Sequence, residues 1–330
     1  MKKRTAIDMG ASMVRVLPRG EGMEQMVDCP SAAALECVTG KPLCYGYDAK
    51  QTSRRMPGSV DVVYPLLEPE SVTSTVLEGL FGCAAEFAHP SGRLHGDLVL
   101  ALPGIVGEEQ EEAYPEAASV CGAKDVFVIG GLYAASRGVA LAPDGYNLVC
   151  HVGASAAEIG IFLHGECLDS RVVAMGGHAF DDLLGDYIYD QHAILLDAEG
   201  AEDAKLRLSQ LPKEEKTLTV SGIHRKTGLP RTAELEAQPL RAVLAGAFSY
   251  FTDPISEMAA QLGEMPTYAV LTGGSAPLCG LAEAIGACLP DCVVEIASDP
   301  ANAVIRGLYA IMESGELDQT DRQKRKKERT

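Results

Sequence analysis

A Gly-Ala-Ser triplet that follows a short apolar segment occurs twice in this 330-residue chain, each time in the same kind of surroundings. Ile7-Asp8-Met9-Gly10-Ala11-Ser12 returns as Cys150-His151-Val152-Gly153-Ala154-Ser155. Each copy ends a short apolar segment that is typical of a strand, and two further strand-like segments follow. Because the motif stands at the same place in two similar series, duplication explains it better than chance. The sequence therefore predicts two related domains, each opening with a three-stranded meander.

Strand and helix signals alternate along the rest of the chain, which predicts an α/β fold. The strands expected in the first half are Thr5–Asp8, Met13–Leu17, Glu24–Val27, Asp97–Leu102 and Val126–Ile129, and the helices are 70–88, 107–121 and 131–141. The strands expected in the second half are Tyr146–His151, Glu158–Leu163, Glu166–Val173, Thr217–Val220, Arg231–Glu236, Tyr268–Leu271 and Cys292–Ile296, and the helices are 176–192, 200–210, 239–262, 277–288 and 300–313. We expect a first domain of residues 1–142 plus 299–317 and a second of residues 143–298.

The composition excludes several classes of protein. No run of about 18 apolar residues is present, so no membrane-spanning helix is expected, and the first residues lack the apolar core of a signal peptide. We therefore expect a cytoplasmic protein whose ten cysteines are reduced thiols, since no CxxC or zinc-like spacing occurs.

The charge of the chain is unevenly distributed. The formal net charge is −18, and residues 318–330 carry six Lys or Arg and three Asp or Glu, a local +3 that leaves −21 for residues 1–317. A body this acidic repels nucleic acid, so no nucleic-acid partner is expected. Residues 318–330 are predicted to be a disordered basic tail.

The two copies of the motif each predict a turn that can bind phosphate. Consecutive backbone N–H groups at Gly10, Ala11 and Ser12, and at Gly153, Ala154 and Ser155, can point at one anion. Asp8 is placed to hold the waters of a Mg²⁺ ion. His151 stands at the equivalent place in the second copy, and an imidazole is a poor partner for hydrated Mg²⁺. For either turn alone, an ordinary β-hairpin is the alternative.

A third glycine cluster follows a late apolar strand. Gly273, Gly274 and Ser275 come directly after Val270-Leu271-Thr272 and before an expected helix. Close backbone approach at two glycines could seat an adenine or its ribose. A plain strand-to-helix turn is the alternative.

The three clusters together resemble the nucleotide loops of the actin, hexokinase and heat-shock-chaperone ATPase superfamily. Within it the chain resembles the MreB family of bacterial actins over nearly all of residues 4–313, and the most specific stretch is Thr227-Gly228-Leu229-Pro230-Arg231. The resemblance implies two ribonuclease-H-like domains flanking a nucleotide cleft, ATP or ADP with Mg²⁺ as the ligand, and adenosine-side contacts from Glu202, Lys205 and Gly274. It also implies self-association into filaments or partnership with an MreB paralogue.

Departures from the family pattern fall on the chemistry. MreB-like chains have a Thr where Ala11 stands, and an Asp where His151 stands. They carry Glu-Glu-Pro, whose acid positions the attacking water, where this chain has Gly130-Gly131-Leu132. Loss of such an acid removes roughly 10²–10⁴-fold in rate. We therefore expect little or no ATP hydrolysis and no catalytic residue.

Three functions remain to be weighed. The first is a cytoskeletal scaffold in cell shape or intracellular organisation, and the second is a non-polymerising accessory regulator, for example of a metabolic microcompartment. A phosphotransferase is disfavoured because His151 replaces the metal-side acid. The loop 90–96 offers Leu94 for a weak contact at the inner face of the membrane. Separately, Asp181-Asp182 is expected to be the acidic start of a helix.

Overall fold

The computed structural model describes residues 3–56, 58–67, 73–212 and 214–318. The chain divides into two compact units, Met1–Ala140 with Asn302–Thr330 and Leu141–Ala301. Nearly all of the predicted basic tail, from residue 319 onward, lies outside the described residues. No helix in the described ranges is long and apolar enough to cross a membrane.

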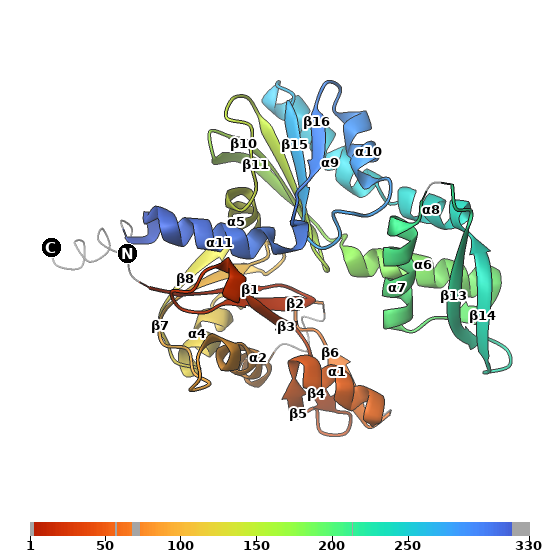
Figure 1. Ribbon diagram of the computed structural model, residues 1–330, viewed down its shortest axis with the longest axis horizontal. Helices are drawn as coiled ribbons and strands as arrows, with labels where there is room; N and C mark the ends of the chain where they lie inside the picture. Colours follow the sequence, from red (N-terminus) through yellow and green to blue (C-terminus); the bar gives the residue numbers. More distant parts are fainter. Residues whose placement is uncertain (1–2, 57, 68–72, 213, 319–330) are drawn as a thin grey trace. The chain divides into compact units, whose positions relative to one another are not determined.

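The first unit is built on a five-stranded sheet, which can be followed in Figure 1. Its strands are β1 (Thr5–Met9), β2 (Met13–Leu17), β3 (Val27–Pro30), β7 (Gly96–Leu102) and β8 (Ala123–Gly130), in the order β3-β2-β1-β7-β8. The first three strands along the chain pair antiparallel, and β7 and β8 then extend the sheet in parallel from β1. All five residues of β1 are buried, as expected for a central strand covered on both faces.

The second unit repeats this plan. Its strands are β9 (Asn147–Val152), β10 (Ala157–Leu163), β11 (Glu166–Val173), β15 (Tyr268–Thr272) and β16 (Val293–Ile296), in the order β11-β10-β9-β15-β16. The antiparallel and parallel pairings follow the same sequence as in the first unit. Two sheets with one strand order and one set of directions confirm the prediction of two ribonuclease-H-like domains.

Helices cover both faces of the first sheet (Figure 1). One face packs on α2 (Ser74–Ala88) and α4 (Ala113–Val120), and the other on α5 (Gly131–Arg137) and α11 (Ala303–Ser314). The helices α5 and α11 touch backbone to backbone, because a Cβ at Gly307 would lie 1.6 Å from the Ala134 carbonyl oxygen. Only glycine permits this approach.

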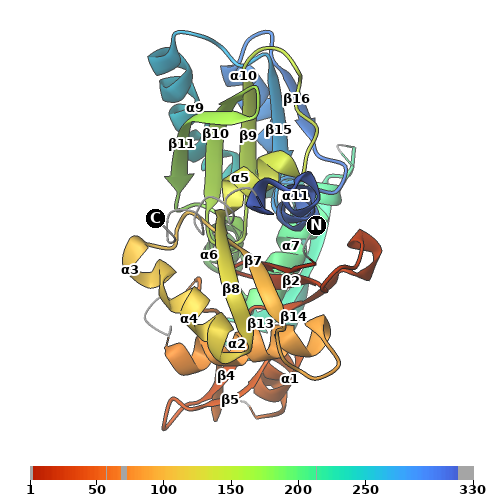
Figure 2. The same ribbon diagram turned by 90° about the vertical axis from the view of Figure 1, so that its left-hand side faces the viewer.

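Each unit also carries a small three-stranded sheet, and residues 33–45 of the one in the first unit are seen at the bottom of Figure 2. In the first unit it consists of β4 (Ala33–Glu36), β5 (Pro42–Tyr45) and β6 (Val60–Val63), with the helix α1 (Gly46–Arg55). In the second unit it consists of β12 (Ile194–Leu195), β13 (Thr217–His224) and β14 (Pro230–Glu236), with the helices α6 (Gly177–His192), α7 (Ala198–Gln210) and α8 (Ala237–Ala245). The sequence predicted no element over residues 33–63.

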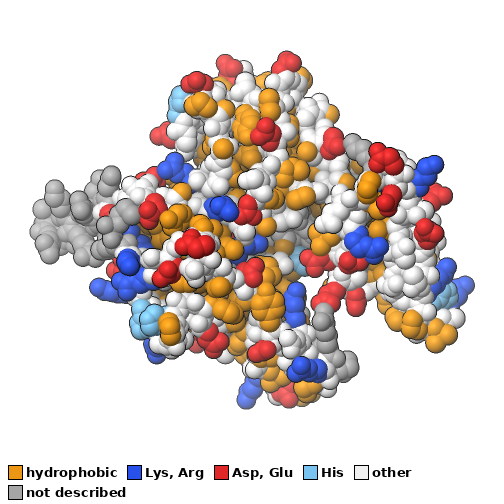
Figure 3. Space-filling view, viewed as in Figure 1, with side chains coloured by type: hydrophobic (Ala, Val, Ile, Leu, Met, Phe, Trp, Pro, Cys, Tyr) orange, Lys and Arg blue, Asp and Glu red, His pale blue; other side chains and the backbone are white. Residues whose placement is uncertain are grey.

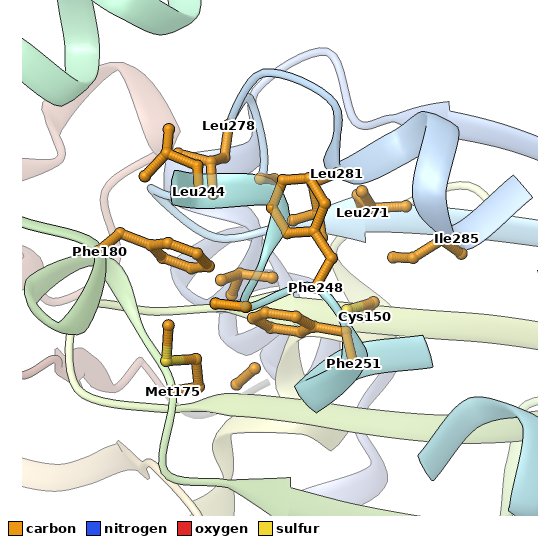
Figure 4. Packing of buried hydrophobic residues seen from close by; sticks show 14 of the residues in the cluster. Cys150, Met175, Phe180, Leu244, Phe248, Phe251, Leu271, Leu278, Leu281 and Ile285 are labelled. Carbon is orange, nitrogen blue, oxygen red and sulfur yellow. The ribbon is translucent and has the colours of Figure 1, made fainter. Parts of the chain in front are cut away.

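Aromatic side chains organise the core of the second unit (Figure 4). The Phe180 ring lies 6.0 Å from the Phe251 ring in a stacked arrangement and 6.2 Å from the Phe248 ring in an edge arrangement. These rings join α6 to α9 (Ser249–Leu262), and Leu281 and Ile285 of α10 (Leu281–Cys288) belong to the same cluster. Aromatic pairs at such distances contribute about 0.5–1.5 kcal/mol beyond burial.

Two expected helices are each divided in the structure. The helix expected at 107–121 is α3 (Glu108–Glu111) followed by α4, with Pro115 in the first turn of α4, where its missing N–H is harmless. The helix expected at 239–262 is divided by a turn at residues 246–248. The apolar positions keep helical spacing through that turn, so their pattern could not reveal the change of axis.

Three further expectations are corrected. The third strand does not span Glu24–Val27, because a 3-10 turn occupies Met23–Gln25 and β3 begins only at Val27, which pairs with Val16. The helix expected at 131–141 ends at Arg137. Leu94 cannot serve as a membrane contact, because its side chain is 2% exposed and its backbone N–H donates to the Cys121 carbonyl at 2.9 Å.

Replacement of Gly307 tests the α5–α11 contact. We expect Gly307→Ala to destabilise the protein by about 1–3 kcal/mol, because the new methyl group overlaps the Ala134 backbone. Gly82→Ala in α2 is the matched control, since a Cβ there meets no atom within 4 Å. It should raise stability by about 0.5–1 kcal/mol through helix propensity. Thermal and urea unfolding measure both, and equal effects of the two variants would contradict the close approach.

Candidate functional site

The first predicted phosphate loop joins β1 to β2 through Gly10, Ala11 and Ser12. The bend is tight at Gly10, where a Cβ would lie 2.6 Å from the Met13 carbonyl oxygen. The Ser12 carbonyl accepts a bond from the Ser31 N–H at 2.9 Å. Within the described residues, the N–H groups of Gly10, Ala11 and Ser12 donate to no acceptor. The loop therefore offers three successive donors to an anion.

Asp8 and Arg15 lie opposite each other where β1 and β2 enter this loop. The Asp8 Oδ2 atom is 3.3 Å from Arg15 Nη1, and Arg15 Nε donates to Asn302 Oδ1 at 2.9 Å. Burial raises the pKa of the Asp8 carboxyl, and the Arg15 guanidinium opposes that rise. Arg15 was not among the predicted site residues, because symmetric pairing around a three-residue loop would set Asp8 opposite Val14, whereas the observed register sets it opposite Arg15.

The second predicted loop joins β9 to β10 and is fixed by its carbonyl groups. The Gly153 carbonyl accepts from the Gly177 N–H at 2.9 Å and from Ser275 Oγ at 3.2 Å, and the Ala154 carbonyl accepts from the His178 N–H at 3.0 Å. Among the described contacts, the N–H groups of Ala154 and Ser155 donate to nothing. The Gly153 N–H, which was predicted to face an anion, instead donates to the Ala156 carbonyl at 2.9 Å, so this loop offers two donors.

The third predicted cluster packs directly on the end of β9. Gly273 has φ +91° and its N–H donates to the Pro300 carbonyl at 2.7 Å. A Cβ at this position would lie 2.2 Å from the Val152 carbonyl oxygen, which also accepts from the Ser275 N–H at 3.1 Å. Gly274 is exposed beside them. The structure thus brings the second and third predicted loops together within the second unit.

The predicted adenosine-side pair lies on α7, in two different environments. Glu202 is exposed, whereas Lys205 is 6% exposed. The Lys205 Nζ atom lies 2.9 Å from Asp181 Oδ1 and 2.9 Å from the Gly177 carbonyl oxygen. Lys205 therefore ties α7 to the start of α6, beside the second loop.

Asp181 corrects one expectation from the sequence. The helix α6 begins at Gly177, so Asp181 lies beyond its first turn and is not an acidic helix start. Burial raises the pKa of Asp181 to about 6, Lys205 works against that rise, and Glu202 adds to it. The sequence missed this ion pair because nothing in the spacing of α6 and α7 relates their faces.

His151 occupies in β9 the place that Asp8 occupies in β1, one residue before the strand ends. It is half-buried and lies opposite Glu158 in β10, just as Asp8 lies opposite Arg15 in β2. The same cross-strand position therefore holds different side chains in the two units. It pairs a carboxylate with a guanidinium in the first unit, and an imidazole with a carboxylate in the second.

The turn from β8 into α5, Gly130-Gly131-Leu132, contains no carboxylate. Gly130 ends that strand, is exposed, and has φ −64° and ψ 138°, which any residue adopts. A Cβ built there meets no atom within 4 Å. The backbone and the surrounding space would therefore accept an acidic side chain at this position.

Comparisons with known proteins agree with this geometry. A family model described as MreB/Mbl protein matches residues 2–320. The chain belongs to the MreB/Mbl family. The cell shape-determining protein Mbl of Bacillus subtilis is 23% identical over 93% of the chain and 95% of its own length. The cell shape-determining protein MreB of Escherichia coli is 25% identical over 92% and 91%.

Solved structures show the same fold for this MreB/Mbl-family chain. MreB5 of Spiroplasma citri bound to ADP superposes with a TM-score of 0.82 at 23% identity, covering 96% of this chain and 99% of that one. The same protein bound to AMPPNP gives the same score. A MamK double helical filament gives 0.75 at 17% identity, covering 94% and 99%. The predicted actin-like fold is confirmed.

Lys205→Met tests the buried ion pair through its pH dependence. The folded pKa of Asp181 lies above its unfolded value, so this carboxyl stabilises the fold at low pH and loses that contribution as pH rises through about 6. Without Lys205 the pKa rises further. We expect a loss of about 3–5 kcal/mol at about pH 7.5, because the ionised carboxylate is left buried without a cation.

At about pH 5 the same variant should lose much less, because Asp181 is then protonated. The matched control is the double variant Lys205→Met with Asp181→Asn, whose stability should depend little on pH. Urea unfolding at both pH values measures the difference. A loss of equal size at both would contradict the assignment.

Proposed function

We propose that this MreB/Mbl-family protein is a cytoplasmic, nucleotide-binding subunit of actin-like filaments that acts as a scaffold in cell shape or intracellular organisation and hydrolyses ATP very slowly or not at all. The observation that carries the proposal is a whole-chain family match combined with glycines at the position of the water-positioning acid. The family match supports the polymer, and the glycines support its low turnover.

Nucleotide binding is supported by what the loops offer. Three glycine-containing loops follow directly on strands. Two of them present N–H groups that donate to no acceptor among the described residues. The MreB5 structures with the same fold were solved with ADP and with AMPPNP. ATP and ADP are therefore the ligands that we propose for Gly10–Ser12, Gly153–Ser155 and Gly273–Ser275.

Self-association is supported by the relatives. Mbl and MreB are named as cell shape-determining proteins, and MamK was solved as a double helical filament. Partners are therefore other copies of this chain or an MreB paralogue. The acidic side chains that are scattered over the face in Figure 3 fit the net charge of −18 and disfavour nucleic acid as a partner.

Slow hydrolysis is tested by adding the missing acid. Gly130→Glu introduces a carboxylate where the backbone and the surrounding space accept one. We expect the wild-type protein to release almost no phosphate from ATP, and Gly130→Glu to release it at least about tenfold faster, because an acid positions the attacking water.

Gly130→Gln is the matched control, since it has the same length and no basic oxygen. Phosphate release under single-turnover conditions measures all three proteins. Rapid hydrolysis by the wild-type protein would refute the proposed low turnover, and equal rates for Glu and Gln would refute the role assigned to position 130.

Assembly is tested by sedimentation and electron microscopy with ATP, AMPPNP and ADP. We expect filaments that form equally well with ATP and AMPPNP and persist after ATP is added, because hydrolysis does not limit their lifetime. Filaments that shorten only with ATP would contradict the proposal. A soluble monomer at high concentration would favour the non-polymerising accessory regulator instead.

A further inference from the structure

The first loop carries its own positive charge. Arg15 lies in register with Asp8 on one side and with Asp28 on the other, so the three side chains share one face of the sheet. Asp28 accepts a bond from the Tyr47 hydroxyl at 3.2 Å, and Asp8 pairs with Arg15 itself. The guanidinium is therefore held at the mouth of the loop, within 3.9 Å of the Cβ position of Gly10.

A Mg²⁺ ion does not fit these residues. Asp8, the carboxylate that the family pattern gives to the metal, is 7% exposed and already neutralised by Arg15 at 3.3 Å. The equivalent position in the second unit holds the imidazole of His151, which suits softer metals. The described residues contain no group of three or more His, Cys, Asp or Glu side chains able to hold a metal.

We propose that Arg15 replaces the divalent cation, so that the protein binds the phosphates of ADP or ATP without metal. This inference rests on the proposed nucleotide binding and deepens it. Arg15 is the residue that compensates the phosphate charge, and Asp8 positions Arg15 instead of a metal.

The geometry of Arg15 suits this role. Its side chain is 16% exposed, so it reaches the surface while remaining fixed. The described contacts use two of its five N–H groups, Nε on Asn302 and Nη1 on Asp8. The remaining donors form the planar fork that binds phosphate oxygens in pairs. Together with the N–H groups of residues 10–12, they supply both the charge and the hydrogen bonds that a polyphosphate needs.

Isothermal titration of the full-length protein with ADP, in EDTA and in Mg²⁺, tests the inference. We expect the two dissociation constants to agree within about threefold. Arg15→Gln should weaken binding at least about tenfold, since a charge-assisted pair is lost, and Arg15→Lys should lose less, because it keeps the charge but not the planar fork. Asp8→Asn should weaken ADP binding by about threefold or less, because Asn302 still holds the guanidinium, whereas loss of a metal-holding carboxylate would abolish binding.

Arg137→Gln is the matched control, because Arg137 pairs with Glu316 at 2.7 Å on other elements of the same unit. Its affinity for ADP should not change. Unfolding curves for each variant separate lost binding from lost folding. If Arg15→Gln fails to fold, the comparison of EDTA with Mg²⁺ and the small effect expected for Asp8→Asn still decide the question.

Each other outcome overturns the inference in a distinguishable way. Binding that disappears in EDTA and on Asp8→Asn would restore the metal and leave the proposed function intact. Unchanged affinity in a less stable Arg15→Gln protein would make the ion pair purely structural. Absence of heat under every condition would remove nucleotide binding itself, and with it this part of the proposed function.

Discussion

In the second loop, the backbone carbonyl groups hold the loop in place, and the backbone N–H groups of Ala154 and Ser155 remain for a ligand. The carbonyl groups of Gly153 and Ala154 accept hydrogen bonds from the N–H groups at the start of α6 and from the Ser275 hydroxyl. Rotation of these peptide groups would break those bonds, so the opposite N–H groups are held in one direction. An anion that meets them requires no rearrangement, and preorganisation of this kind is what makes backbone donors effective against polyphosphate. Lys205, through its bond to the Gly177 carbonyl, stabilises the same arrangement from the far side.

The first loop solves the problem of charge differently. Backbone donors carry only partial charge, and a polyphosphate brings several negative charges that must be compensated. In this chain the compensation lies in the strand pair itself, because Arg15 is held by Asp8 and Asn302. An arginine so restrained loses little side-chain entropy on binding. Because the Asp8 carboxylate is paired with Arg15, it does not hold a metal ion in the proposed site.

Much of the fold could be predicted from the sequence, because an internal repeat and the alternation of strand-like and helix-like segments can be recognised along the chain. The shared motif at residues 7–12 and 150–155 predicts two meanders, and both sheets begin with three antiparallel strands, although the third strand of the first sheet starts only at Val27. The loops predicted to bind phosphate lie at the ends of those strands. The pairing of Lys205 with Asp181 and of Arg15 with Asp8 depends on which faces meet in three dimensions, and no spacing encodes it. The burial of Leu94 escaped prediction for the same reason, since a single apolar residue in a polar loop gives no periodicity.

The chemistry of position 130 and that of position 15 bear on the same property. In the proposed function, a subunit without the water-positioning acid keeps its nucleotide as it was bound. The lifetime of the bound state is then set by dissociation. A fixed guanidinium does not leave with the nucleotide, whereas a hydrated metal does, so the phosphate contacts must break while the positive charge stays in place. Slow hydrolysis and a built-in cation thus favour the same outcome, a long-lived subunit whose state changes by exchange.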